Sequence, residues 1–236
     1  MKVAVLSDIH GFSFALDRVL ADIATEPGID RMVIAGDLCE VGPDPRGVLE
    51  RVATLDAVVL QGNTDRDVAN GSRDSEGIRF TADQIGAEGL KYLRNLRFSE
   101  RVTPPGGESP RDDLLVVHAN PLDQDRHVPP DASPHELREL LGDTASAVIA
   151  FGHLHVAYIR ELPTMTLIDV SAVGNPKDGD LRSKWGLLEW DEDARRWSVT
   201  LRYVDYPIEE TEAQIMASGI PNPKGVIRKL RKASYS

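Results

Sequence analysis

Five short apolar segments recur along the first two thirds of the chain, and a polar or charged residue follows each of them closely. Continuous Val, Ile and Leu runs are typical of parallel strands that are buried on both faces. Apolar residues at helical spacing between the segments, as in 14–23 and 45–55, predict helices that connect these strands. A third helix, capped by Thr81, is expected over about 81–96. The five apolar segments are 2–6, 31–35, 57–60, 114–117 and 147–151.

The last third of the chain follows a different pattern. Four short segments within 156–203 alternate with turn sequences, which is typical of antiparallel strands. Before them, residues 120–135 hold four prolines and several charges, so an irregular surface loop is expected there. A short helix is predicted over 134–141. The chain therefore combines crossover units, which favour a mostly parallel sheet, with antiparallel strands.

Composition narrows the functional classes. With 236 residues and 41% apolar content, the chain can bury a sizeable core. No segment approaches the roughly 18 apolar residues of a membrane span, and we expect neither a membrane association nor a signal peptide. Cys39 is the only cysteine, which excludes an internal disulfide and fits a cytoplasmic location.

The formal net charge of −11 argues against a general nucleic-acid-binding surface. A small anionic substrate stays open, since bound metal ions can reverse the local charge. A homo-oligomer also stays open. The end of the chain is the exception, because a basic helix or tail is expected from about residue 207. It is interpreted as a solvated face or, alternatively, a partner site; its cations are Lys224, Arg228, Lys229, Arg231 and Lys232.

Seven residues with metal-binding side chains come directly after the five apolar segments. Open α/β sheets bind ligands beyond the carboxyl ends of their strands, so these residues should meet in one crevice. Residues two apart in extended chain point to the same side, which lets each Asp-x-His or His-x-His pair reach one ion. Any one of them alone would be interpreted as a cap or a core hydrogen bond. The seven are Asp8, His10, Asp37, Asn63, His118, His153 and His155.

The donor set indicates the class of metal. Imidazoles, carboxylates and one amide, without thiolate, suit Mn, Fe, Zn, Co or Ni and contain too much nitrogen for calcium. Seven ligands exceed the four of a structural zinc site. We therefore expect two divalent transition-metal ions, with manganese preferred, that share one carboxylate.

The ordered motifs Asp8-Ile9-His10, Gly36-Asp37, Gly62-Asn63, His118 and Gly152-His153-Leu154-His155 resemble those of the calcineurin-like metallophosphoesterases. The resemblance covers residues 1 to about 190 and is nearest to the small single-domain prokaryotic phosphodiesterases. It implies that Asp8, His10 and His155 hold one metal, that Asn63, His118 and His153 hold the other, and that Asp37 bridges them. A hydroxide between the two ions would then attack phosphorus.

The expected fold is a single α/β domain over 1–236, a four-layer α-β-β-α sandwich of two mixed sheets flanked by helices. The expected function is metal-dependent hydrolysis of a phosphodiester. Two alternatives stay open: a phosphomonoesterase acting on proteins or nucleotides, and a non-catalytic binding scaffold on the same fold.

The sequence departs from the family pattern after Asn63. Many members carry a histidine there that protonates the leaving oxygen, whereas this chain has Thr64, whose hydroxyl cannot act as an acid near neutral pH. This absence favours diesters with a good leaving group, or a proton donor elsewhere. His127 and His135, in or near the long loop, are the candidates, although each also fits an ordinary surface histidine. Phe12 and the pair Ser171-Ala172 are further departures from the pattern.

Other residues near the motifs are weaker candidates. Asp65 is predicted to assist catalysis by orienting a histidine ligand, with an acidic helix cap as the alternative. Asn63, Thr64 and Arg66 are predicted to contact substrate, since a guanidinium suits phosphate. Asn120 and Lys177 are weaker substrate candidates, and Cys39 is interpreted as a small packed residue.

Overall fold

The computed structural model describes residues 1–235 and contains two five-stranded mixed sheets. The first sheet has the order β10-β9-β1-β2-β3 and the second the order β4-β5-β6-β8-β7. The strands of the first are β1 (Lys2–Leu6), β2 (Arg31–Ile34), β3 (Val58–Val59), β9 (Ser183–Asp191) and β10 (Arg196–Val204). Those of the second are β4 (Ser99–Val102), β5 (Leu114–Val117), β6 (Val148–Phe151), β7 (Tyr158–Glu161) and β8 (Thr166–Asp169).

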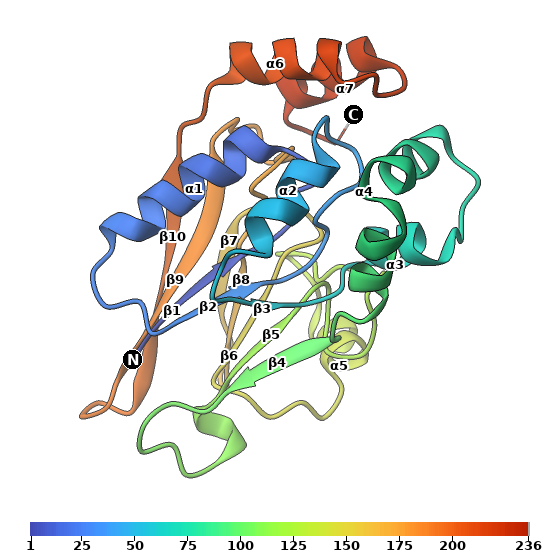
Figure 1. Ribbon diagram of the computed structural model, residues 1–236. Helices are drawn as coiled ribbons and strands as arrows, with labels where there is room; N and C mark the ends of the chain where they lie inside the picture. The colour runs from blue at the N-terminus through green and yellow to red at the C-terminus, as the bar shows by residue number, and fades with distance from the viewer. Residues whose placement is uncertain (236) are drawn as a thin grey trace.

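Seven α-helices lie within the described residues, and most of them cover the outer face of the first sheet (Figure 1). A short 3₁₀ turn, Pro110–Asp112, sits in the loop between β4 and β5. No helix within 1–235 combines the length and apolar character needed to cross a bilayer. The helices are α1 (Ser13–Thr25), α2 (Pro45–Val52), α3 (Asn63–Asn70), α4 (Glu76–Arg94), α5 (Pro134–Leu141), α6 (Ile208–Ala217) and α7 (Pro223–Lys232).

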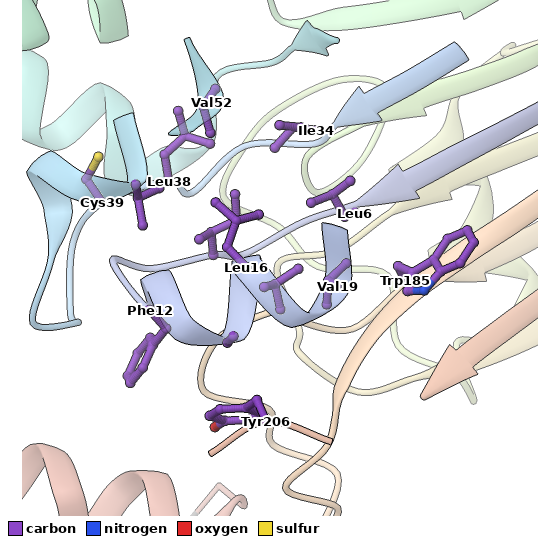
Figure 2. Close-up of a cluster of buried hydrophobic side chains, with 14 of the residues drawn as sticks. Leu6, Phe12, Leu16, Val19, Ile34, Leu38, Cys39, Val52, Trp185 and Tyr206 are labelled. Atoms are coloured by element: carbon purple, nitrogen blue, oxygen red, sulfur yellow. The ribbon is translucent and has the colours of Figure 1, made fainter. Parts of the chain in front are cut away.

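Three buried clusters define the layers. One cluster lies between the sheets and joins side chains such as Val5 of β1 to Val116 of β5. A second lies between the first sheet and its helices and includes Leu16, Trp185 and Cys39 (Figure 2). A third lies under α5 on the outer face of the second sheet. This arrangement confirms the expected sandwich of two mixed sheets flanked by helices, and Cys39 is a packed core residue as expected.

Strand direction determines where the functional residues meet. β1, β2 and β3 are parallel, with Leu6 opposite Ile34 and Ile34 opposite Val59. In the second sheet β5 and β6 are also parallel, with Val116 opposite Ala150. The loops that follow the carboxyl ends of these five strands therefore lie near one another, and they carry the candidate metal ligands.

The start of the helix expected over about 81–96 was wrong. The helix α3 was not expected, and α4 begins at Glu76, where the Ser75 side chain accepts a hydrogen bond from the Ile78 amide. Thr81 therefore lies inside a helix and does not cap one. The backbone of Gly86, with a φ of 64°, interrupts α4.

Candidate metal centre

Asp8, His10 and His155 form one cluster of facing ligand atoms. The Nε2 atoms of His10 and His155 are 3.0 Å apart, and each lies within 3.5 Å of Asp8 Oδ1. All three side chains are buried. Nitrogen and oxygen atoms that face one another this closely are favourably arranged when a cation lies among them.

A second cluster joins Asn63, His118 and His153. His118 Nε2 is 3.0 Å from Asn63 Oδ1 and 3.1 Å from His153 Nδ1. Asp37 lies between the two clusters, with Oδ2 at 3.7 Å from His10 Nε2 and Oδ1 at 3.6 Å from His118 Nε2. The structure thus brings together all seven residues that the sequence singled out.

The backbone of these residues is not extended, contrary to the geometric argument made from the sequence. Asp8, His10, Asp37, His153 and His155 all have positive φ, between 54° and 67°. Non-glycine residues adopt this left-handed conformation at a cost of order 1–3 kcal/mol each, and such residues concentrate at functional sites. Tight left-handed turns, and not extended chain, aim the paired side chains at a common point.

Two glycines leave room for the carboxylates. A Cβ on Gly62 would lie 2.0 Å from Asp37 Oδ1, and one on Gly152 would lie 2.2 Å from Asp8 Oδ2. Neither position can therefore carry a side chain while the carboxylate stays in place. The freed space admits two backbone hydrogen bonds, from the Thr64 amide to Asp37 Oδ1 and from the His153 amide to Asp8 Oδ2.

Backbone carbonyl groups orient all four histidines. The Nδ1–H groups of His10, His118 and His155 donate to the carbonyl oxygens of Glu40, Ala35 and Asn175 at 2.8–2.9 Å. His153 uses the opposite atom, and its Nε2–H donates to the Asp125 carbonyl at 2.9 Å. In each ring the other nitrogen faces the centre, as a metal ligand requires. Sequence reasoning missed these contacts because a carbonyl group carries no residue signature.

The electrostatics of the centre also suit cations. Burial works to lower the pKa of His10, but contact with Asp8 and the charge of Asp37 outweigh it and raise that pKa to about 9. Burial likewise works to lower the pKa of His118, yet Asp37 and Asp8 raise it. The carboxylates therefore attract positive charge strongly.

One oxygen of the centre lacks a well-formed hydrogen bond. Among residues 1–235 no donor points at Asp8 Oδ1, although the His155 ring nitrogen is 3.0 Å away. A buried carboxylate oxygen without a donor is costly, and a cation coordinated there would satisfy it. The residues present therefore fit a bound metal.

Asp65 supports the centre through the backbone. Its carboxylate accepts hydrogen bonds from the amides of Asp37, Leu38 and Gly62 at 2.7–3.0 Å. It contacts no histidine in these hydrogen bonds, so the structure differs from the predicted orientation of a histidine ligand. Burial and the charge of Asp37 raise its pKa to about 6, although the amides work in the opposite direction.

The residues predicted to contact substrate have mixed surroundings. The buried Thr64 hydroxyl has no hydrogen-bond partner within 1–235. The Arg66 guanidinium pairs with Asp67 and Asp125, so binding a phosphate would require it to leave these carboxylates. The Asn120 side chain donates to the Arg126 carbonyl and accepts from the amides of Leu122 and Asp123, all within its own loop.

The two candidate proton donors lie in different places. The His127 ring is exposed and its centroid is 6.4 Å from that of His153, beside the second cluster. His135 is on the exposed face of α5, near Glu139. An unforeseen neighbour of the centre is Tyr235, whose hydroxyl donates to the carbonyl of Leu154, between the two histidines of the last motif.

The chain belongs to the calcineurin-like phosphoesterase family, because the model of that family, described as calcineurin-like phosphoesterase, matches residues 1–157. The matched span contains every residue of both clusters. The buried Asp and His groups within that span are a candidate metal site.

Similar proteins include a symmetrical bis(5'-nucleosyl)-tetraphosphatase of Acidovorax sp. (strain JS42), which is 36% identical over 135 residues. That match covers 52% of this chain and only 46% of the relative. Among solved structures, a metallophosphoesterase from Sphaerobacter thermophilus is 24% identical with a TM-score of 0.77, covering 99% of both chains. A hypothetical protein from Pyrococcus horikoshii OT3 is 19% identical with a TM-score of 0.83, covering 100% and 99%. The structural likenesses show a shared fold.

Proposed function

We propose that the chain hydrolyses phosphodiesters with the help of two divalent metal ions. The observation that carries the proposal is the placement of Asp37 between two clusters of ligand atoms. Asp8, His10 and His155 would hold one ion, and Asn63, His118 and His153 the other. Manganese is the metal to test first, since the donor set is rich in nitrogen and oxygen and has no thiolate.

When bound, two such metal ions lower the pKa of water from about 15.7 toward 7 and offset negative charge on the phosphoryl oxygens. The chain itself supplies the orientation. Backbone carbonyls fix the ring of each histidine, and the glycines at 62 and 152 let the carboxylates approach closely. Geometry held before the substrate arrives is the main contribution that a protein makes to such a site.

Thr64 supports the choice of a diester over a monoester. Its hydroxyl is buried, its amide is bonded to Asp37, and no acid occupies the position where many family members carry one. A substrate whose leaving group needs little protonation suits that arrangement. The similarity to a tetraphosphatase favours a phosphoanhydride or diester over a simple monoester, although the match spans half of this chain.

The test is hydrolysis of bis(4-nitrophenyl) phosphate by manganese-loaded protein, with 4-nitrophenyl phosphate as the monoester comparison. Hydrolysis of the diester is expected to be faster, to stop on chelation and to fall at least a hundredfold in Asp37→Ala. Asp193→Ala, an exposed acid far along the chain, is the control and should keep full activity. A faster monoester would support a phosphomonoesterase, and absence of both activities in metal-replete protein would support a scaffold.

A further inference from the structure

The loop over residues 120–126 is held to the beginning of α3 at two neighbouring points. Gln124, which is 9% exposed, donates a hydrogen bond from Nε2 to the Gln61 carbonyl at 2.7 Å. The next residue, Asp125, accepts two parallel hydrogen bonds on its carboxylate from the Arg66 guanidinium, both at 2.9 Å. The loop therefore keeps a defined position relative to the helix that carries Asn63.

The guanidinium of Arg66 is itself fixed by a buried acid. Its Nε and Nη2 groups donate to Asp67 Oδ1 at 3.2 and 3.0 Å, and the Asp67 side chain is only 6% exposed. Arg73 also donates to Asp67, from Nε to Oδ2 at 2.6 Å. Because a guanidinium is planar and rigid, the edge that meets Asp67 sets the direction of the edge that meets Asp125.

Asp125 connects this ion-pair network to a metal ligand. Its backbone carbonyl accepts the hydrogen bond from His153 Nε2–H at 2.9 Å, and His153 Nδ1 faces Asn63 Oδ1 at 3.2 Å. Asn63 and Arg66 are three residues apart in α3, so they lie on neighbouring turns of one helix. One helix thus supplies a ligand atom of the second cluster and, through Asp125, orients the histidine beside it.

His153 depends on such support more than the other ligand histidines do. His10, His118 and His155 are buried, whereas His153 is partly exposed and its hydrogen bond to the Asp125 carbonyl is open to solvent. A ring with fewer packing contacts relies on its hydrogen bond for orientation. Hydrogen bonds of this kind fix the tautomer and ring direction of a ligand histidine.

We propose that Arg66 is a positioning residue of the second metal site: through Asp125 it holds His153 in the orientation and tautomer that a metal ion requires. The proposal rests on the proposed two-metal centre. It replaces the expectation that Arg66 contacts the substrate phosphate, because both edges of its guanidinium are occupied by carboxylates.

The first test examines the His153 ring in metal-free protein. Nitrogen-15 spectra of histidine-labelled protein at pH 8 distinguish protonated from unprotonated ring nitrogens, and His153→Gln identifies the signals. Wild type should show a single tautomer that is protonated at Nε2. Asp125→Ala removes the carboxylate but keeps the carbonyl, and we expect it to move the two nitrogen shifts toward each other, as should Arg66→Met. Unchanged shifts in either variant would overturn the proposal.

Arg195→Met is the matched control. Arg195 also pairs with two carboxylates, those of Glu108 and Asp112, but it lies in the turn between β9 and β10, at the opposite end of the strands from the metal centre. We expect this variant to keep the wild-type spectrum and wild-type metal binding.

The second test measures manganese binding by calorimetry. Wild type should bind two ions, and Asp125→Ala should bind the second at least tenfold more weakly, since loss of such an orienting contact typically costs about 10–100-fold in metal affinity. The first ion should bind as in wild type. Arg66→Met should have the same effect, and the double variant should be no weaker than either single variant. Full affinity for both ions in Asp125→Ala would contradict the positioning role.

The two tests keep this proposal separate from the proposed function. Wild-type protein that binds fewer than two manganese ions would refute the two-metal centre, and the metal-free spectra would still decide whether Arg66 orients His153.

Kinetics distinguish positioning from contact with phosphate. We expect Asp125→Ala and Arg66→Met to lower kcat for bis(4-nitrophenyl) phosphate to a similar extent, and excess manganese to restore both. A phosphate-binding Arg66 would predict a different pattern, with a raised KM in Arg66→Met alone, wild-type kinetics in Asp125→Ala and no recovery with manganese. That pattern would overturn the proposal.

Discussion

Single residues of this protein are held in costly conformations and surroundings wherever the two clusters need them. The positive φ of His10 and the donor-free oxygen of Asp8 are examples, and a bound cation would offset the energetic cost of both. The residue types were recognisable from the sequence, since aspartate and histidine after apolar strands are unusual. Their left-handed backbone and the carbonyl partners of the rings could not be, because backbone geometry follows from tertiary packing.

Asp169 offers a test at this scale, since it is fully buried at the end of β8. Its Oδ1 accepts a hydrogen bond from the Ser171 amide, but Oδ2 has no partner within 1–235, and burial raises its pKa well above the usual value. The native state thus retains a proton that the unfolded chain releases above pH 4. The bound proton therefore stabilises the native state. This contribution is complete below the pKa of Asp169 in the unfolded chain and is lost as pH rises through its pKa in the native state.

Asp169→Asn removes this ionisation while keeping an oxygen for the Ser171 amide. We expect the metal-free variant to be more stable than wild type at pH 8, by about 2–4 °C in Tm for each kcal/mol relieved, and similar to wild type at pH 4. Calorimetry at the two pH values measures the difference, with exposed Asp193→Asn as the control. A variant that is less stable than wild type at pH 8 would contradict this account.

At the scale of elements, the start of α3 links two strand ends. Gly62, Asn63 and Asp65 belong to one turn. Gly62 allows the close approach of Asp37, Asn63 provides a ligand atom, and the Asp65 carboxylate accepts hydrogen bonds from backbone amides. The strands and α5 were predictable from apolar pattern and turn residues. This helix was not, because its short polar sequence has no apolar periodicity and its stability comes from contacts with the loop after β2.

Asp65→Ala should therefore loosen that loop. Three buried amides would lose their acceptor, and each such loss costs about 1–3 kcal/mol, so we expect a loss of at least about 3 kcal/mol in the free energy of unfolding. Manganese affinity should also fall at least tenfold. Guanidinium denaturation and metal titration measure the two effects. The control Asp83→Ala, on the exposed face of α4, should change stability by no more than about 0.5 kcal/mol. Unaltered stability and metal affinity in Asp65→Ala would show that these amide contacts are dispensable.

At the scale of the whole molecule, the parallel strands of two sheets bring distant parts of the chain to one place. The order of motifs on successive strands made this convergence predictable. The cavity lined by α7 and the beginning of α4 was not, because helices far apart in the sequence enclose it. The expectation of a single domain over 1–236 stays a prediction, supported by the shared core in which Leu230 of α7 and Leu6 of β1 both take part.

The central claim is that two metal ions lie on either side of Asp37. An anomalous difference map from manganese-loaded crystals tests it most directly. The account predicts two peaks roughly 3.5–4 Å apart, with Asp37 contacting both, one beside Asp8 and His155 and the other beside Asn63 and His118. No peak, or a single peak away from Asp37 in crystals grown at saturating manganese, would contradict it.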